Sequence, residues 1–151
     1  MRLTTMTDYA MRLLMYVGRH PDRLCTISEI AQAYQISEPH LMKITHRLAQ
    51  RGWIITVRGK NGGMRLGRRP EDICLGAVLR DTENDLAIVE CFVDGNNCTL
   101  SGRCGLTGII EGALQQFLQH LDGYTLADIL PEPANRGAAP AEQVIKLVNM
   151  N

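Results

Sequence analysis

The chain has 151 residues, of which 45% are hydrophobic and 21% are charged, a composition typical of one or two small globular units with a packed core. A large multidomain enzyme, a disordered chain and a fibrous protein are excluded by these values. No apolar run approaches the roughly 18 to 20 residues of a membrane span, and residues 1–30 lack the features of a signal peptide, so we expect a soluble cytoplasmic protein with no membrane partner.

The formal net charge of zero conceals two halves of opposite charge. Residues 1–70 hold twelve Lys and Arg against four Asp and Glu, and residues 71–151 hold four against twelve. A basic half of this kind favours binding to a polyanion such as nucleic acid, and the acidic half then has another task.

The first predicted helix covers residues 9–17, where apolar residues repeat with a period near 3.6. Thr7 and Asp8 supply a capping start, and Gly18 with Pro21 a stop. A short helix capped by Ser28 follows and breaks near Gln35.

Ser37 then caps a further helix that runs to about Gln50, with Glu38 and Pro39 in its first turn. Two short helices joined by a tight turn form a helix-turn-helix pattern. Between its apolar positions the second helix exposes four polar side chains: His40, Lys43, His46 and Arg47.

Residues 54–66 read as a strand, a Gly-rich turn and a returning strand. The turn carries Arg58 and Lys60, and it lies directly after the second helix of the pair. A basic hairpin in that position is a wing, which together with the helix pair predicts a winged helix-turn-helix that binds DNA.

The second half begins with a predicted helix at 70–82 and a loop at 91–105. A longer helix starts at Leu106, and its apolar stripe is wide for so small a second half, which favours packing against a partner chain over packing on its own first domain. We therefore expect a mainly α fold with a small β-hairpin wing and a long dimerisation helix. Its units are a DNA-binding domain at 1–82, a cysteine loop (91–104) with the dimerisation helix at 83–130, and an exposed tail at 131–151.

Five cysteines in a chain without an export signal argue against a disulfide framework. Cys25 and Cys74 stand alone among apolar residues and are expected to be small buried side chains. Cys91, Cys98 and Cys104 share one loop, without the closely spaced pairs of most zinc sites and one short of the four thiolates usual in iron–sulfur clusters. Their spacing leaves a labile metal site and reactive free thiols open.

No enzyme motif is present: the four histidines are scattered, and the Gly-rich residues 59–63 lie in a hairpin and not before a helix. We therefore expect a protein that is not an enzyme.

Several stretches carry a resemblance to a known family. LTTMTDYAMRLLMY, ISEIAQAYQISEPHLMKITHRLAQRGWI, VRGKNGGMRLGR and ICLGAVLRDTE, followed by three cysteines and GLTGIIEGALQQFLQHLDGYTLADIL, resemble the Rrf-type winged-helix transcriptional regulators. The resemblance covers residues 1 to about 130 and is strongest to the iron–sulfur repressors that sense nitric oxide.

The resemblance implies a homodimer with one iron–sulfur cluster per chain, [4Fe-4S] in preference to [2Fe-2S], held by Cys91, Cys98 and Cys104. In similar proteins the remaining ligand comes from the other subunit, and the matching residue is Asp8, which would otherwise be a helix cap or dipole partner.

The resemblance also implies that the cluster-loaded dimer represses transcription from a two-fold symmetric, A·T-rich DNA operator and is released when nitric oxide nitrosylates the cluster. The expected DNA-binding residues lie in the second helix of the pair and in the wing: Ser37, Glu38, Pro39, His40, Lys43, Arg47, Arg58, Lys60, Asn61 and Gly62.

Two alternatives stand beside this interpretation. The first is a regulator of the same family that senses cluster supply or redox state, but its ligand histidine has no counterpart between Cys91 and His120. The second is a small redox enzyme or electron carrier, for which no substrate pocket or second redox centre is visible in the sequence.

Overall fold

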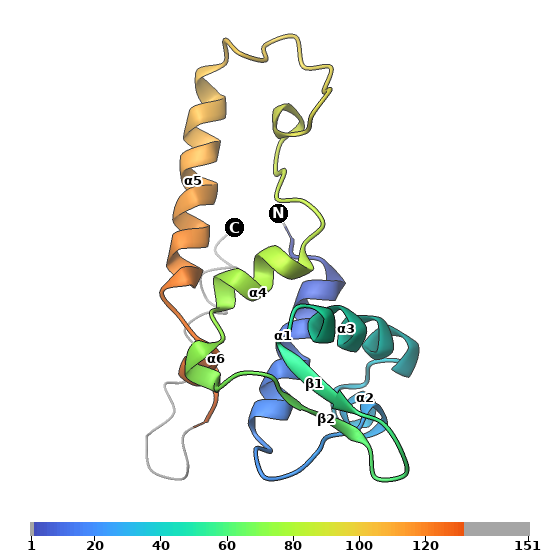
Figure 1. Ribbon diagram of the computed structural model, residues 1–151. Coiled ribbons are helices and arrows are strands. Elements are labelled where there is room, and N and C mark those ends of the chain that lie inside the picture. Colours follow the sequence, from blue (N-terminus) through green and yellow to red (C-terminus); the bar gives the residue numbers. More distant parts are fainter. Residues whose placement is uncertain (1, 132–151) are drawn as a thin grey trace.

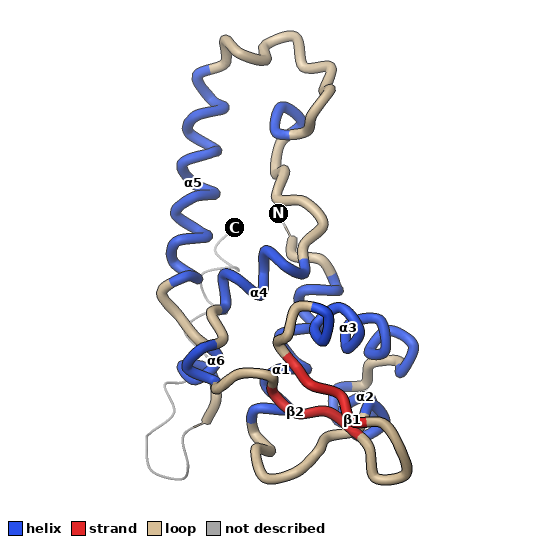
Figure 2. The backbone as a smooth tube through the Cα atoms, viewed as in Figure 1, coloured by secondary structure: helices blue, strands red, loops and turns tan. Residues whose placement is uncertain are grey.

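The computed structural model of the chain describes residues 2–131 and is mainly helical, with one two-stranded hairpin (Figures 1 and 2). The fold class expected from the sequence is confirmed. The order of elements is α1 (Thr5–Gly18), α2 (Ile27–Tyr34), α3 (Glu38–Gln50), β1 (Ile54–Val57), β2 (Gly63–Leu66), α4 (Leu75–Thr82), α5 (Gly105–Asp122) and α6 (Leu126–Ile129), with single 3₁₀ turns at Pro70–Asp72 and Glu90–Phe92.

The hydrophobic core lies around α1, which contacts α2, α3, α4, α6 and β2. Helices contribute side chains at the spacing of one buried face, and each fully buried Leu or Ile contributes about 1.5 to 3 kcal/mol. The fully or almost fully buried residues of this core include Leu13, Leu14, Ile30, Leu41, Ile44, Leu48, Ile54, Met64, Ile73, Val78 and Leu126.

α1 begins four residues earlier than the sequence indicated. Thr4 is the capping residue, and its hydroxyl accepts a hydrogen bond from the backbone N–H of Thr7. Thr7 lies inside the helix and is fully buried, and its own hydroxyl donates to Thr82 at 2.9 Å. Thr4, Thr5 and Thr7 are equally good caps by residue type, so the sequence alone did not choose between them.

The helix-turn-helix forms as expected, with one shift at its start. Thr26, and not Ser28, caps α2 by accepting from the N–H of Glu29. α2 ends at Tyr34, and the next residue, Gln35, has a φ of 55° that turns the chain sharply toward α3. α3 begins after Ser37 and ends at Gln50, as predicted.

The hairpin follows α3 directly and pairs Ile54 with Leu66 and Val57 with Gly63. Cys25 adds a short third pairing, because its N–H and C=O bond with the backbone of Met64. This pairing ties the start of α2 to β2, so the wing is fixed to the helix pair.

Residues 70–82 form two elements where the sequence predicted one helix. Ile73 and Cys74 are extended between the 3₁₀ turn and α4. They pair with the chain after α5, since the N–H of Leu126 donates to the carbonyl of Ile73 and Cys74 bridges to Thr125. This long-range pairing replaces the helical hydrogen bonds.

α5 and the cysteine loop (91–104) extend away from the compact end of the molecule (Figure 1). None of the eighteen residues of α5 is buried, and Leu106 and Ile109 are 58% and 71% exposed. The expected tail at 131–151 lies outside the described residues from 132 onward. Among residues 2–131, none of the helices has both the length and the hydropathy that a membrane span requires.

Candidate nucleic-acid interface and cysteine loop

The exposed face of α3 carries the polar side chains expected to meet DNA. Leu41, Ile44 and Leu48 turn into the core, which leaves His40 and Lys43 exposed on the other side. Ser37, Glu38 and Pro39 are also exposed at the start of the helix, and the Ser37 hydroxyl makes no capping hydrogen bond. The first turn of α3 therefore presents free polar groups at the end that helix-turn-helix proteins insert into the major groove.

His40 also contacts α1. Its ring lies edge-on to that of Tyr9, with the centroids 6.1 Å apart. Both residues line a small cavity of about 190 Å³ between α1 and α3, together with Lys43. The orientation of His40 is therefore linked to the position of α1.

The turn of the hairpin exposes Arg58, Lys60 and Asn61. Gly59 has a φ of 112°, a conformation that favours glycine, and the N–H of Gly62 donates to its carbonyl at 2.9 Å. A side chain on Gly62 would meet the carbonyl oxygen of Val57, so this glycine is needed for the tight turn.

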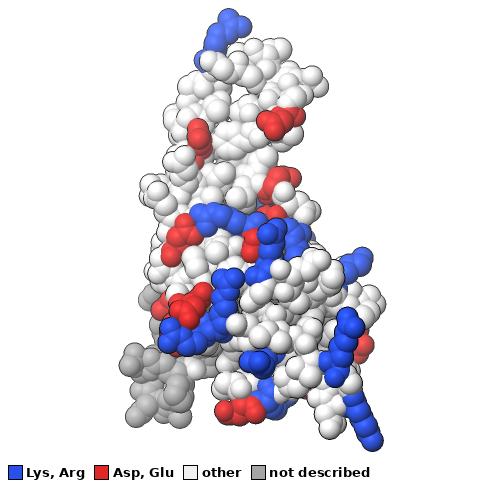
Figure 3. All heavy atoms as spheres, viewed as in Figure 1, with Lys and Arg blue, Asp and Glu red and all other residues white. Residues whose placement is uncertain are grey.

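The basic side chains are unevenly distributed over the molecule. On the face drawn in Figure 3, Lys and Arg gather over the compact end that contains α1 to α4 and the hairpin, whereas the extension formed by α5 and the cysteine loop carries few charges. This agrees with the charge difference between the two halves of the sequence.

Arg47 differs from the other residues expected to bind DNA. It is half-buried, and its guanidinium donates to the carbonyls of Asp81 and Glu83 and to the side chain of Asn84. These acceptors lie at the end of α4 and just beyond it.

All five cysteines are free thiols. Cys25 is fully buried, as expected for a small apolar side chain, while Cys74 and the three cysteines of the loop are half-buried. Two of the loop cysteines share a neighbour. The Cys91 sulfur lies 3.6 Å from the Thr107 hydroxyl, and hydrogen bonds from the backbone and hydroxyl of Thr107 and from the backbone of Leu106 lower the pKa of the Cys104 thiol.

The remaining residues of the expected site make local contacts of their own. Cys98 is held through its backbone N–H, which donates to the Asn96 side chain at 3.1 Å. Asp8 lies in the first turn of α1 and forms an ion pair with Arg12 at 2.9 Å. Within residues 2–131 of this single chain, no three His, Cys, Asp or Glu side chains converge to hold a metal ion.

The donor set nevertheless fits an iron–sulfur cluster by its chemistry. Three free thiols occupy one segment with little regular structure, and hydrogen bonds favour the thiolate form of one of them. Thiolates select zinc or iron–sulfur clusters over hard cations. The Asp8 carboxylate is 48% exposed and accessible to a second chain.

Residues 3–132 match the family model described as an iron-dependent transcriptional regulator, Rrf2. The chain belongs to the Rrf2 family. Rrf2 relatives include two proteins named HTH-type transcriptional regulator NsrR. The NsrR of Geobacillus kaustophilus is 47% identical to this chain, in an alignment that covers 89% of this chain and 93% of the relative. The NsrR of Bacillus subtilis is 43% identical, in an alignment that covers 99% of both chains.

Solved structures agree with the Rrf2 assignment. IscR of T. potens superposes with a TM-score of 0.71 at 24% identity, over 91% of this chain and 94% of its own. CymR, the global cysteine regulator of B. subtilis, superposes with a TM-score of 0.65 at 26% identity. The superposition covers 85% of this chain and 95% of the CymR chain. This chain therefore has the winged-helix fold of these regulators, and its family is one of transcriptional regulators.

Two contacts in this Rrf2 chain were missed by sequence reasoning. Thr107 lies three residues after Cys104, the spacing at which a residue in the first turn of a helix meets its cap, and that spacing could have indicated the contact. The partners of Arg47 are 34 to 37 residues away in the chain, and no local signal indicates them.

Proposed function

We propose that this protein is a transcriptional repressor that binds a two-fold symmetric operator as a cluster-loaded homodimer and releases it on exposure to nitric oxide. The observation that carries the proposal is the combination, in one chain, of a winged helix with a basic exposed face and a separate loop of three free thiols. The names of the NsrR relatives support it.

The DNA-binding unit is residues 1–82, with α3 in the major groove and the hairpin in the adjacent minor groove. Two-fold proteins of this class place their half-sites about 34 to 36 Å apart or at multiples of that spacing. A basic wing favours the narrow minor groove of A·T-rich sequence. The exposed residues assigned to this contact are Ser37, Glu38, Pro39, His40, Lys43, Arg58, Lys60 and Asn61, with Gly62 shaping the turn.

The dimerisation unit is residues 83–130. α5 exposes Leu106 and Ile109, and Cβ atoms added at Gly108 and Gly112 would meet open space in this chain. A second copy is the occupant proposed for this helix, because an eighteen-residue helix with no buried side chain is not stabilised by its own chain alone.

Cys91, Cys98 and Cys104 would hold the cluster, with Asp8 of the partner subunit as a further ligand. We propose a [4Fe-4S] cluster, with [2Fe-2S] as the alternative. When bound, it supplies iron–thiolate bonds that nitric oxide attacks. The exposed carboxylate of Asp8 can exchange between such a ligand role and its ion pair with Arg12. α1 would then report the state of the loop to α3 through the contact between Tyr9 and His40.

The first test is the content of iron, acid-labile sulfide and zinc in protein purified without oxygen. We expect about four iron and four sulfide per chain and a visible chromophore that nitric oxide bleaches. Operator binding should fall in step with the bleaching. Zinc, or no metal after attempted cluster reconstitution, would contradict the proposed cofactor. Full operator affinity after stoichiometric nitric oxide would contradict the proposed signal.

A pair of cysteine variants sharpens this test. Cys98→Ser should lose most of the iron and the chromophore, because an alcohol is a poor ligand for iron in a cluster. Cys74→Ser is the matched control: it removes a half-buried thiol outside the loop, at a capping position of α4 that suits serine. Equal iron content in the two variants would exclude the assigned ligand set.

A further inference from the structure

All three nitrogens of the Arg47 guanidinium donate hydrogen bonds to the end of α4 and the two residues after it. Nε donates to the carbonyl of Asp81 at 2.6 Å, Nη1 to the Asn84 side chain at 3.2 Å and Nη2 to the carbonyl of Glu83 at 3.4 Å. The planar guanidinium presents its donors in a fixed fork, so such a set of acceptors specifies both its position and its orientation. α3 is thereby attached to a segment more than thirty residues further along the chain.

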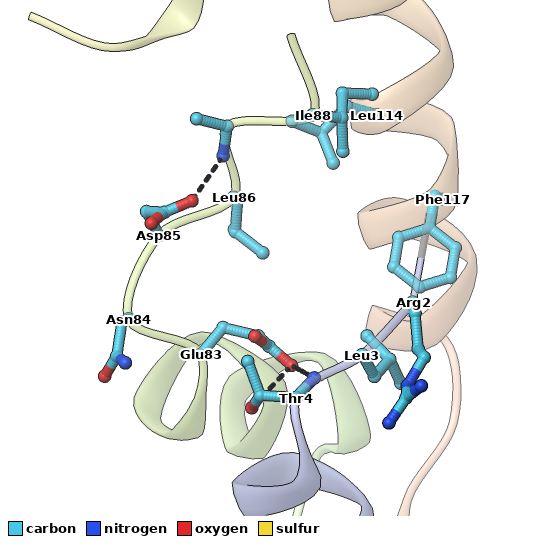
Figure 4. Close-up of a pocket in the computed structure, with 11 residues that line it drawn as sticks. Arg2, Leu3, Thr4, Glu83, Asn84, Asp85, Leu86, Ile88, Leu114 and Phe117 are labelled. Carbon is cyan, nitrogen blue, oxygen red and sulfur yellow. Dashed lines mark hydrogen bonds between the residues drawn. The ribbon is translucent and has the colours of Figure 1, made fainter. Parts of the chain in front are cut away.

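Residues Asp81 to Asn84, which include these three acceptors, also bind two other parts of the fold. We call them the 81–84 junction. The indole N–H of Trp53, just after α3, donates to the Asp81 carboxylate at 2.8 Å, and Arg51 lies 3.5 Å from the other oxygen. At the start of α1, the N–H of Thr4 donates to the Glu83 carboxylate at 2.9 Å (Figure 4).

The centre of the junction is inaccessible to water, whereas Asp81 is half-buried and Asn84 is exposed. Thr82 and Glu83 are 1% and 9% exposed, and the Thr82 hydroxyl is satisfied by bonds to Thr7 and to the carbonyls of α4. Hydrogen bonds from charged groups are stronger than neutral ones and depend closely on geometry when water is excluded. The junction therefore has one well-defined arrangement that relates α1, α3 and α4.

The chain leaves the junction toward the cysteines. Residues 84–88 form one wall of a cavity of about 370 Å³, with the start of α1 beneath and Leu114 and Phe117 of α5 opposite (Figure 4). Cys91 follows three residues later. Residues 84–88 thus connect the cysteine loop directly to the junction along the chain.

We propose that Arg47 is a positioning residue that sets the angle of α3 through the 81–84 junction, and that it does not contact DNA phosphate. The proposal rests on the DNA-binding function proposed above and assigns within it how the recognition helix is oriented. In the dimer, this orientation determines which half-site spacing both α3 helices can reach together.

The test separates charge from geometry by substituting Arg47 in two ways. Arg47→Lys keeps the positive charge but loses the planar fork of donors that matches the three acceptors, and Arg47→Ala removes both the charge and the fork. Lys43→Ala removes an exposed charge on the face of α3 assigned to DNA, and Arg19→Ala removes an exposed arginine at the end of α1 as the matched control. The probe is a labelled duplex with the symmetric sequence that the wild-type dimer selects from a randomised library.

We expect Arg47→Lys and Arg47→Ala to weaken binding to this duplex by about tenfold or more, because α3 is no longer held in one orientation. The slope of log K against log salt should stay at the wild-type value, because no phosphate contact is lost. Lys43→Ala should reduce the magnitude of that slope by about 1.8, the value for two lost phosphate contacts, one from each subunit of the dimer. Arg19→Ala should change neither. Circular dichroism and thermal unfolding confirm that each variant is folded.

A second readout is the spacing of the half-sites. Inserting one base pair between them should cost the wild type more affinity than it costs either Arg47 variant, because α3 is then less firmly oriented. Asn84→Ala removes one acceptor from the junction and should shift the spacing preference in the same direction by a smaller amount.

Arg47→Lys with wild-type affinity, together with a reduced slope for Arg47→Ala, would overturn the proposal and make Arg47 a phosphate contact. An unchanged spacing penalty in both Arg47 variants would also overturn it. Failure of the wild-type dimer to select any sequence would instead refute the proposed function itself, so the two failures are distinguishable.

Discussion

Cysteines in this chain differ in reactivity because their surroundings differ. Cys25 is fully buried beside β2, and burial raises the pKa of its thiol to about 11. Cys104 caps α5, where hydrogen bonds from Thr107 and Leu106 lower the pKa of its thiol. A thiolate is the form that binds metal and reacts with electrophiles. Cys104 is therefore the more reactive thiol of the two, and Cys25 is a residue of the core.

This difference gives a prediction for cluster-free protein at pH 8. Iodoacetamide should leave Cys25 unmodified, because a thiol with a pKa of about 11 is ionised to roughly one part in a thousand at that pH and is also shielded from the reagent. Peptide mass spectrometry should find the label on Cys104 in the folded protein. Cys25 should carry the label only after the protein has been unfolded in urea. Labelling of Cys25 in folded protein at the rate of Cys104 would refute the assigned burial.

At the scale of elements, α4 and α5 are joined at one end by a bidentate ion pair. Arg80 donates to both oxygens of Asp122, at 2.6 and 2.7 Å. Gly76 lies beneath this pair, and a Cβ there would meet the Asp122 carboxylate, so a glycine is needed for the approach. The pair fixes the direction in which α5 leaves the compact end.

The ion pair predicts a specific dependence of stability on pH. The hydrogen bond from Arg80 lowers the pKa of Asp122, so the stabilisation is present above the ordinary carboxyl pKa of about 3.9 and is lost as pH falls through the lower, folded value. In urea unfolding, the difference in free energy between wild type and Asp122→Asn should be constant above about pH 5 and should shrink below about pH 4.

The partner residue supplies the control for this measurement. The difference in free energy of unfolding between wild type and Arg80→Gln should shrink at low pH in the same way. The double variant should be little less stable than either single variant, since each substitution removes the same interaction. Independent, additive losses would show that the pair does not act as a unit.

The elements also show which parts of the fold could be predicted from local sequence. α3 was predicted correctly because its apolar period, a serine at the position before the helix and Pro39 in its first turn all indicate the same start, although the Ser37 hydroxyl makes no capping hydrogen bond. The break at Ile73 was missed, because it depends on pairing with Leu126 more than fifty residues later. The candidate site divides in the same way: residue types indicated the three thiols of the loop and the basic face, but the partners of Arg47 depend on tertiary structure.

At the scale of the whole molecule, the long helix α5 projects from the compact end, and its apolar side chains are not buried by the rest of this chain. α5 stands away from the compact end in Figure 1, and its most exposed large apolar side chain is Ile109 at 71%. Exposed apolar area on a helix of this length is the usual mark of an interface. A second copy would cover this area and, in the proposed site, bring Asp8 of the partner subunit to the cysteine loop.

Ile109→Glu should therefore convert a dimer into a folded monomer. Because Ile109 is largely exposed within the chain, a charge there costs the monomer little, whereas burying it in an interface without a partner charge is strongly unfavourable. Gln115→Glu is the matched control, since it adds the same charge at an exposed position about 120° around α5. Light scattering coupled to size exclusion should give a monomer for the first variant and a dimer for the second.

Loss of the dimer should also affect the cluster, which links the oligomeric state to the proposed site. A monomer cannot supply Asp8 from a second chain, so cluster-loaded Ile109→Glu should release iron faster to a chelator than Gln115→Glu does. Asp8→Ala in the dimeric background should release iron as fast as the monomer, since both lack the same carboxylate. A monomeric variant that retains iron as long as the wild type would place the fourth ligand within the same chain and exclude the shared site.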